Sequence, residues 1–160
     1  MAAPPEPAQP PLAPDPPDSV FFKLVRVVNL TARPFQQRVG RQHQLTLNEW
    51  RTMAVLGRHP GLTATQVADL TGLDKMAVSR ALAGLQRRKR LRRQDDPTDQ
   101  RRTRLYLSSI GKALFATVAA QARERESELF AGVAPAELMQ LDAVLDKLVA
   151  SVSGQAGSSS

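Results

Sequence analysis

Residues 63–107 read TATQVADLTGLDKMAVSRALAGLQRRKRLRRQDDPTDQRRTRLYL, and the first half of this stretch carries two helix signals. Thr63 and Gln66 have capping-box spacing, so a helix is expected to start there and to end near Gly72. Asp74 can cap a second helix, in which apolar residues recur at the helical period: Val78, Leu82 and Leu85. Two helices joined by so short a turn predict a helix-turn-helix.

The second half of the stretch changes its apolar period from about 3.6 residues to about 2. Residues 91–94 and 103–107 alternate like strands, and the polar residues 95–99 between them include the turn former Pro97. This pattern predicts a β-hairpin that carries five arginines: Arg92, Arg93, Arg101, Arg102 and Arg104. A helix-turn-helix followed directly by a basic hairpin, the wing, predicts a winged helix.

Two further helices are expected before this stretch. Thr46 and Glu49 form another capping box, and the helix that it opens should turn three residues inward: Leu47, Trp50 and Ala54. A helix from about residue 18 to about residue 40 contains Pro34, which cannot donate a backbone hydrogen bond, so a kink or a break is expected there.

The sequence after the hairpin predicts two more helices. The first should start at Ser108 and break near Gly132, and Pro135 should open the second. Apolar residues of the last helix are spaced by three and four, namely Leu138, Leu141, Leu145, Leu148 and Val152. This pattern suits packing against a second copy of the same helix.

Composition excludes several function classes. The chain has no cysteine and only two histidines, so it cannot build a thiolate metal site and has little from which to build any other. No Ser–His–Asp set, glycine-rich phosphate loop or metal-ligand cluster is apparent, so neither an enzyme nor a cofactor or metal is expected. No apolar run is long enough to span a membrane and no secretory signal is visible, so no membrane-spanning segment is expected and the expected location is the cytoplasm.

The positive charge is concentrated in one short segment. The net charge of the chain is +7, but residues 75–104 alone hold eleven basic and three acidic side chains. The remaining 130 residues hold eleven basic and twelve acidic ones. A positive electrostatic field confined to so short a segment predicts a polyanionic partner, either a nucleic acid or an acidic membrane surface.

The second helix of the pair, expected at about residues 74–88, is the predicted recognition helix for the major groove. With its apolar stripe inward, Ala77 lies near the edge of the outward face, which presents Lys75, Met76, Ser79, Arg80 and Ala83. Arg80 can contact either a guanine or a phosphate. Arg87 begins a basic run that ends at Arg90 and is expected to contact phosphates.

Several of these segments resemble the MarR family of transcriptional regulators. The resemblance runs from about Phe21 to Leu148 and rests on four stretches in the expected order: Leu45-Thr-Leu-Asn-Glu-Trp50, Thr63-Ala-Thr-Gln-Val-Ala-Asp-Leu-Thr-Gly-Leu73, Val78-Ser-Arg80 and Asp96-Pro-Thr-Asp-Gln-Arg-Arg102 with Leu105-Tyr-Leu-Ser108. The last is the most specific, because it reproduces the family's wing signature. Where the family usually has a glycine after the recognition helix, this chain has Lys89, which costs about 1 kcal/mol if the position is left-handed.

The resemblance implies a mainly α fold with a small β-hairpin wing, in which a winged helix-turn-helix domain is flanked by N- and C-terminal dimerisation helices. The expected divisions are a disordered proline-rich tail (1–18), an N-terminal dimerisation and pocket helix (19–45), the DNA-binding lobe (46–108), C-terminal dimerisation helices (109–152) and a flexible tail (153–160). It also implies a homodimer that represses by binding a pseudo-palindromic operator in double-stranded DNA. Arg101 of the wing (about 91–108) then enters the minor groove, Asp99 helps to hold the wing, and Arg102 adds a DNA contact.

Members of the family generally respond to a small effector, often an aromatic acid or a phenol. The residues on the corresponding segments are Arg26, Arg33, His43, Trp50 and Arg51. The alternative is a winged-helix protein-interaction or architectural DNA-binding module without ligand response. A protein-interaction module predicts an exposed apolar patch on the recognition helix, where this chain has Lys75, Ser79 and Arg80.

Overall fold

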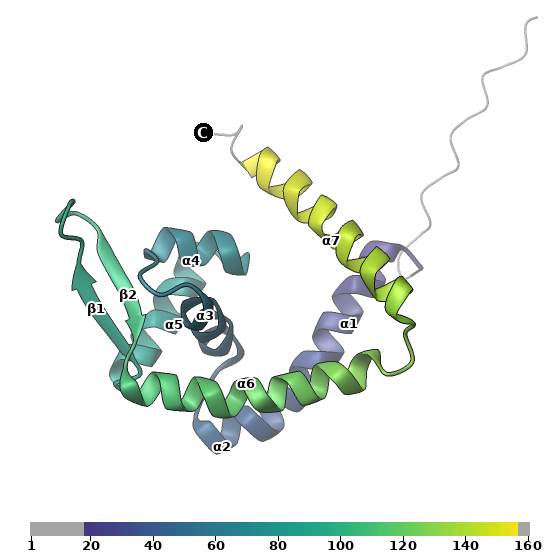
Figure 1. Cartoon of the computed structure of the whole chain (residues 1–160), viewed down its shortest axis with the longest axis horizontal. Coiled ribbons are helices and arrows are strands. Elements are labelled where there is room, and N and C mark those ends of the chain that lie inside the picture. Colours follow the sequence, from purple (N-terminus) through teal and green to yellow (C-terminus); the bar gives the residue numbers. More distant parts are fainter. Residues whose placement is uncertain (1–17, 157–160) are drawn as a thin grey trace, which may run out of the picture. The chain divides into compact units, whose positions relative to one another are not determined.

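The computed structural model describes residues 18–156, which fall into two compact units divided between Lys112 and Ala113. The first unit contains α1 (Val20–Phe35), the π-helical segment η1 (Gln36–Gly40), α2 (Arg41–His43), α3 (Leu47–Arg58), α4 (Ala64–Thr71), α5 (Lys75–Arg87), β1 (Leu91–Asp95) and β2 (Thr103–Leu107) (Figure 1). Helix α6 (Ser109–Phe130) begins in the first unit and continues into the second, which also contains α7 (Pro135–Ala156). The fold is the predicted one, mainly α with a single antiparallel hairpin.

Local capping signals place the central helices where the sequence predicts them. The side chains of Thr63 and Thr46 each accept a hydrogen bond from the backbone N–H three residues later. In return, the side chains of Gln66 and Glu49 accept the backbone N–H of the threonine. Gly72 closes α4 in the left-handed conformation, with φ of 67°. The helix-turn-helix therefore consists of α4 and α5.

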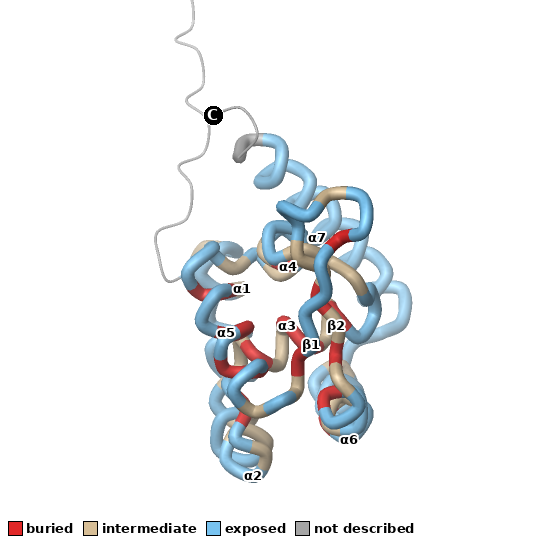
Figure 2. The backbone as a smooth tube through the Cα atoms, turned by 90° about the vertical axis from the view of Figure 1, so that its left-hand side faces the viewer, coloured by how far each residue is buried: buried red, intermediate tan, exposed pale blue. Residues whose placement is uncertain are grey.

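Most of the core lies in the first unit, mainly on α3, α5 and the two strands, with Val67 of α4 (Figure 2). In the second unit Val118 of α6 is also buried. The predicted stripe of α5 is buried in full, with Val78, Leu82 and Leu85 each no more than 3% exposed. The inward face predicted for α3 is wrong. Its buried residues are Glu49, Thr52, Met53 and Leu56, because α3 packs against α5 and α4 through the side that carries the capping glutamate. Leu47, Trp50 and Ala54 are only half-buried.

The wing is joined to the helical core by a third short pairing. Strands β1 and β2 pair from Leu91 opposite Leu107 to Asp95 opposite Thr103. Beside them, Leu62 forms an isolated bridge with Leu105, whose N–H donates to the Leu62 carbonyl at 2.9 Å. The hairpin thus extends a pairing that begins in the loop before α4.

The outer helices differ in detail from the predicted boundaries. Pro34 does not end its helix, because the chain passes from α1 into the wider η1 segment and stays helical up to His43. Helix α7 ends at Ala156, four residues beyond the predicted end at Val152, so the flexible tail predicted from residue 153 begins as helix. The predicted proline-rich tail lies outside the described residues except for Asp18, as does the rest of the C-terminal tail.

The outer helices are also largely exposed. No residue of α1 is buried, and every residue of α7 whose side chain is described is exposed. Among residues 18–156, no helix combines the length and the apolar character needed to cross a membrane.

Candidate nucleic-acid interface

The outer face of α5 presents most of the predicted contact residues. Asp74 caps the helix through a 2.7 Å hydrogen bond that its side chain accepts from the Ala77 N–H. Ala77, predicted near the edge of this face, is only 7% exposed and lies on the side of α5 that lines a cleft against α3. Its contact with DNA stays a prediction. The exposed residues are Lys75, Met76, Ser79, Arg80, Ala83, Gln86 and Arg87.

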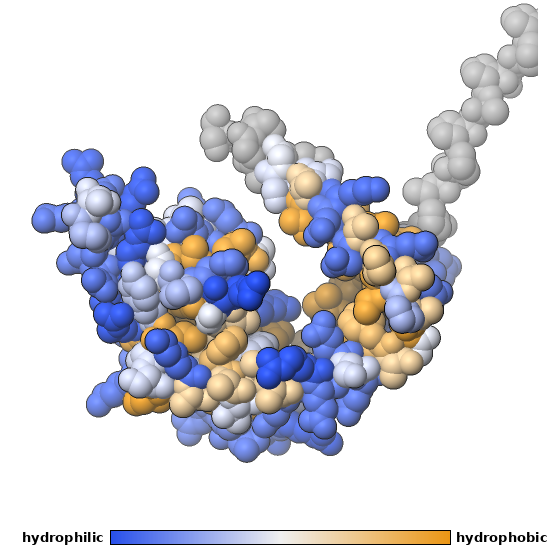
Figure 3. Space-filling view, in the orientation of Figure 1, coloured by the Kyte–Doolittle hydropathy of each residue, from blue (hydrophilic) through white to orange (hydrophobic). Residues whose placement is uncertain are grey.

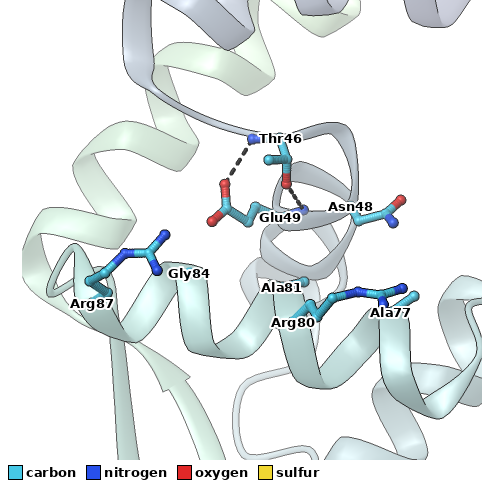
Figure 4. A pocket seen from close by; sticks show the side chains of 8 residues that line it. All are labelled: Thr46, Asn48, Glu49, Ala77, Arg80, Ala81, Gly84 and Arg87. Atoms are coloured by element: carbon cyan, nitrogen blue, oxygen red, sulfur yellow. Dashed lines mark hydrogen bonds between the residues drawn. The ribbon is translucent and has the colours of Figure 1, made fainter.

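A cleft of about 290 Å³ lies between the first turn of α3 and α5 (Figure 4). Its lining residues come from both helices: Thr46, Asn48, Glu49, Ala77, Arg80, Ala81, Gly84 and Arg87. Sequence reasoning gave no role to the α3 side of this cleft, since nothing in the sequence shows that the capping box lies against α5.

Glu49 and Gly84 lie against each other in the lining of the cleft. Glu49 Oε2 accepts the Thr46 N–H at 2.7 Å, and its Oε1 lies 3.8 Å from Arg88 Nη1. A Cβ at Gly84 would overlap Oε1 of Glu49. Any larger residue at position 84 would therefore have to displace the buried carboxylate of Glu49.

The wing is fixed by a buried carboxylate that the sequence analysis did not single out. Asp96 is 3% exposed, and its Oδ1 accepts both the backbone N–H and the hydroxyl of Thr98, at 2.9 and 2.7 Å. Its Oδ2 lies 2.6 Å from Arg104 Nη2. These hydrogen bonds, from Thr98 first and then from Arg104, hold the pKa of Asp96 well below its usual value. The available signal was the Asp-Pro-Thr order, which is typical of a side-chain-capped turn.

The residues predicted at the wing tip are exposed around Asp99. The Asp99 carboxylate accepts the Arg101 N–H at 3.1 Å and lies 3.2 Å from Arg102 Nε. Both arginines are exposed, and hydrophilic side chains cover this end of the molecule (Figure 3). Arg104 differs from them, because its guanidinium donates hydrogen bonds to Asp96 and to the Gly61 carbonyl and its side chain is only partly exposed.

The basic run after α5 has more than one role. Arg87 lines the cleft and Arg88 lies near Glu49. Arg90 donates to the carbonyls of His43 and Gln44, at 2.5 and 3.0 Å, and its burial and the nearby Arg88 lower its pKa. Arg90 therefore ties the end of α2 to the start of the wing, which leaves it poorly placed for the phosphate contact predicted for the whole run.

Lys89 is exposed and has φ of 56°, so the position is left-handed as the comparison with the family's usual glycine suggested. Its carbonyl accepts the Ser108 hydroxyl at 2.7 Å, which helps to hold the turn.

The residues predicted to contact an effector are spread over α1, α2 and α3. Arg26 and Arg33 are exposed on α1, and Arg51 is half-buried on α3. Trp50 stacks on Phe35 with ring centroids 6.3 Å apart. His43 is half-buried, and its Nε2 is enclosed without a hydrogen-bond partner. None of the five lines the cleft between α3 and α5. In residues 18–156 no group of three or more His, Cys, Asp or Glu side chains is placed to bind a metal.

Comparison with known proteins agrees with this geometry. A model of the MarR family matches residues 43–102, whereas no curated protein matches the chain. A MarR/EmrR family transcriptional regulator from Acinetobacter sp. ADP1 is 27% identical with a TM-score of 0.72, and the match covers 84% of this chain and 92% of that one. BpsR from Bordetella bronchiseptica, whose DNA binding is regulated by 6-hydroxynicotinic acid, is 26% identical with a TM-score of 0.71, covering 81% and 97%. S. aureus MepR, solved as a DNA complex, shares the fold at 24% identity with a TM-score of 0.74, covering 83% and 98%.

Proposed function

We propose that this chain is a homodimeric repressor of a pseudo-palindromic operator and a member of the MarR family of DNA-binding transcriptional regulators, which are not enzymes. A model of that family matches residues 43–102, and regulators of the family share the fold at 26% and 27% identity. In this proposal α5 enters the major groove and the wing enters the adjacent minor groove. Because its target is chromosomal DNA, its expected location is the cytoplasm.

The observation that carries the proposal is the pairing of exposed cations with a rigid support. Arg80 and Arg87 lie on the outer face of a helix whose inner face is completely buried. Arg101 and Arg102 lie on a wing held by the Asp96 network. Such an arrangement suits contacts with DNA, because the backbone that carries the cations is fixed before binding and only the side chains lose freedom on contact.

Dimerisation is supported by apolar side chains that remain exposed on the outer helices. Helix α1 exposes Val20, Phe21 and Val28, at 71%, 76% and 49%. Helix α7 exposes the whole predicted leucine stripe, with Leu138, Leu141, Leu145 and Leu148 between 37% and 46% exposed. Apolar surface of this extent is typical of a protein interface. A two-fold dimer would present two copies of α5 to a two-fold operator.

We further propose that a small aromatic acid or phenol modulates DNA binding, as 6-hydroxynicotinic acid does for BpsR. The candidate contacts are those predicted from the sequence: Arg26, Arg33, His43, Trp50 and Arg51. His43 supports this proposal most directly, because its enclosed Nε2 has no hydrogen-bond partner among residues 18–156 and buried polar atoms are normally paired.

The test is fluorescence anisotropy of the full chain on two duplexes over a range of salt concentrations. One duplex carries the promoter next to the protein's own gene and the other has the same bases scrambled. Binding tighter to the promoter by about a thousandfold, with affinity falling steeply as salt rises, is the expected result. Equal binding to both would instead indicate an architectural DNA-binding protein, and no binding to either would favour a protein-interaction module.

A further inference from the structure

The cleft between α3 and α5 lies on the same side of α5 as its exposed arginines. Arg80 and Arg87 are seven residues apart, so they lie two turns apart on one face of the helix, about 10 Å along its axis. In Figure 4 the Asn48 side chain reaches the Arg80 end of the cleft from α3, and Arg87 lies at the other end.

The floor between these polar ends is small and apolar. Ala77, Ala81 and Gly84 line the α5 side, so no large side chain of α5 fills the space. Glu49 is the carboxylate in the lining, and its charge is engaged by the Thr46 N–H and lies near Arg88. Two arginines, Arg80 and Arg87, also line the cleft, so its lining carries more positive than negative charge.

The chemistry of this lining fits a monovalent tetrahedral anion. Guanidinium groups donate hydrogen bonds to phosphate oxygens and attract them through their positive charge. The Asn48 amide adds a neutral hydrogen-bond donor. The cleft is also continuous with the outer face of α5 proposed to contact DNA, so a phosphate of the bound duplex is the anion placed to reach it.

We propose that this cleft holds a backbone phosphate of the bound DNA, which makes the first turn of α3 a third DNA-contacting element beside α5 and the wing. This inference rests on the proposed DNA-binding function and adds Asn48 as a contact residue. A phosphate contact fixes the position of the protein on the duplex but carries no base information. Its loss should therefore weaken binding to every sequence alike.

The substitution Asn48→Asp should weaken DNA binding without destabilising the fold, so it tests the proposed contact separately from folding. Asn48 is the second residue of α3, where an acidic side chain interacts favourably with the helix dipole, so the melting temperature should stay the same or rise. The same carboxylate would repel a phosphate in the cleft. We expect the affinity for both duplexes to fall at least about tenfold, with their ratio unchanged and the dependence on salt shallower by about one counterion.

Gln42→Glu is the matched control, since it makes the same change of net charge at an exposed position of α2. It should change the affinity about twofold or less. Asn48→Ala removes the amide without adding charge and should weaken binding severalfold. The proposal is overturned if Asn48→Asp binds both duplexes as tightly as Gln42→Glu does, or if only the operator affinity falls, which would indicate a base contact. Failure of the proposed function itself is distinguishable, because the wild-type protein would then bind neither duplex.

Discussion

Arg104 and Asp96 form an ion pair at 2.6 Å between a buried carboxylate and a guanidinium that also donates to the Gly61 carbonyl at 3.1 Å. The pair therefore connects the wing to the loop between α3 and α4. The exposed arginines of the wing tip lie on the hairpin that this pair holds, and of the two members only Asp96 is buried.

Asp96→Asn tests this relationship through the sign of its effect on DNA binding. The substitution removes a negative charge, so charge alone predicts tighter binding to a polyanion. Loss of the ion pair should instead loosen the wing and weaken operator binding about tenfold or more, and should lower the free energy of unfolding by about 1–3 kcal/mol. Anisotropy and denaturant unfolding measure the two effects. Asp95→Asn makes the same charge change at the exposed neighbouring position and should bind at least as tightly as the wild type.

The low pKa of Asp96 sets the pH range of this effect. Because its pKa lies below the unfolded value of 3.8, the stabilisation is complete well above that value and is lost as the pH falls through the folded pKa. The difference in unfolding free energy between the wild type and Asp96→Asn should therefore be constant from about pH 5 to pH 8 and shrink in more acidic solution. A constant difference down to pH 2 would argue against a charged Asp96 as its source.

Arg101→Ala should weaken operator binding about tenfold and reduce the salt dependence by about one counterion, because the proposed minor-groove contact loses its cation. Anisotropy over a range of salt concentrations measures both quantities. Arg123→Ala removes an exposed cation from α6 and is the control, with little expected change. An unaltered affinity and slope for Arg101→Ala would remove this residue from the interface.

Gly84→Ala should destabilise the protein by about 1–3 kcal/mol, even though alanine is the better helix former. The reason is that the added Cβ overlaps the buried Glu49 carboxylate. Gly154→Ala in α7 is the matched change, because its Cβ meets no atom within 4 Å, and it should give a small gain. Thermal unfolding compares the two. Equal effects would show that the contact at Gly84 relaxes without cost.

Lys89→Gly should raise the free energy of unfolding by about 1 kcal/mol, since glycine adopts the left-handed conformation without strain. Lys89→Ala keeps a Cβ in that conformation and removes the same charge, so it should not share the gain. Chemical denaturation of both variants is the measurement, and a similar gain for both would point to charge rather than backbone strain.

Leu141→Glu should impair dimerisation, because it places a charge in the leucine stripe of α7. Met139→Glu introduces the same charge on the other side of the helix, where the side chain is 74% exposed, and should leave the dimer intact. Sedimentation velocity distinguishes monomer from dimer. A Leu141→Glu protein that sediments like the wild type would place the interface elsewhere.

Features set by residues close in sequence were predictable, and those set by distant residues were not. The caps at Thr46, Thr63 and Asp74 link residues three apart, so their patterns are visible in the sequence. Arg90 instead bonds carbonyls 46 and 47 residues away, and Arg104 bonds one 43 residues away, which no local pattern reveals. The buried side of α3 was missed for the same reason, since it depends on where α5 packs.

Trp50 is the single tryptophan of the chain, and its ring lies against Phe35 of α1. The intrinsic fluorescence of the protein therefore comes from one place, the junction of α1 and α3. Any change in the environment of that junction will shift the emission of one indole, with no second tryptophan to dilute the signal. The molecule thus carries its own optical probe at one of the proposed effector contacts, and titrating small aromatic acids against its emission requires neither labelling nor DNA.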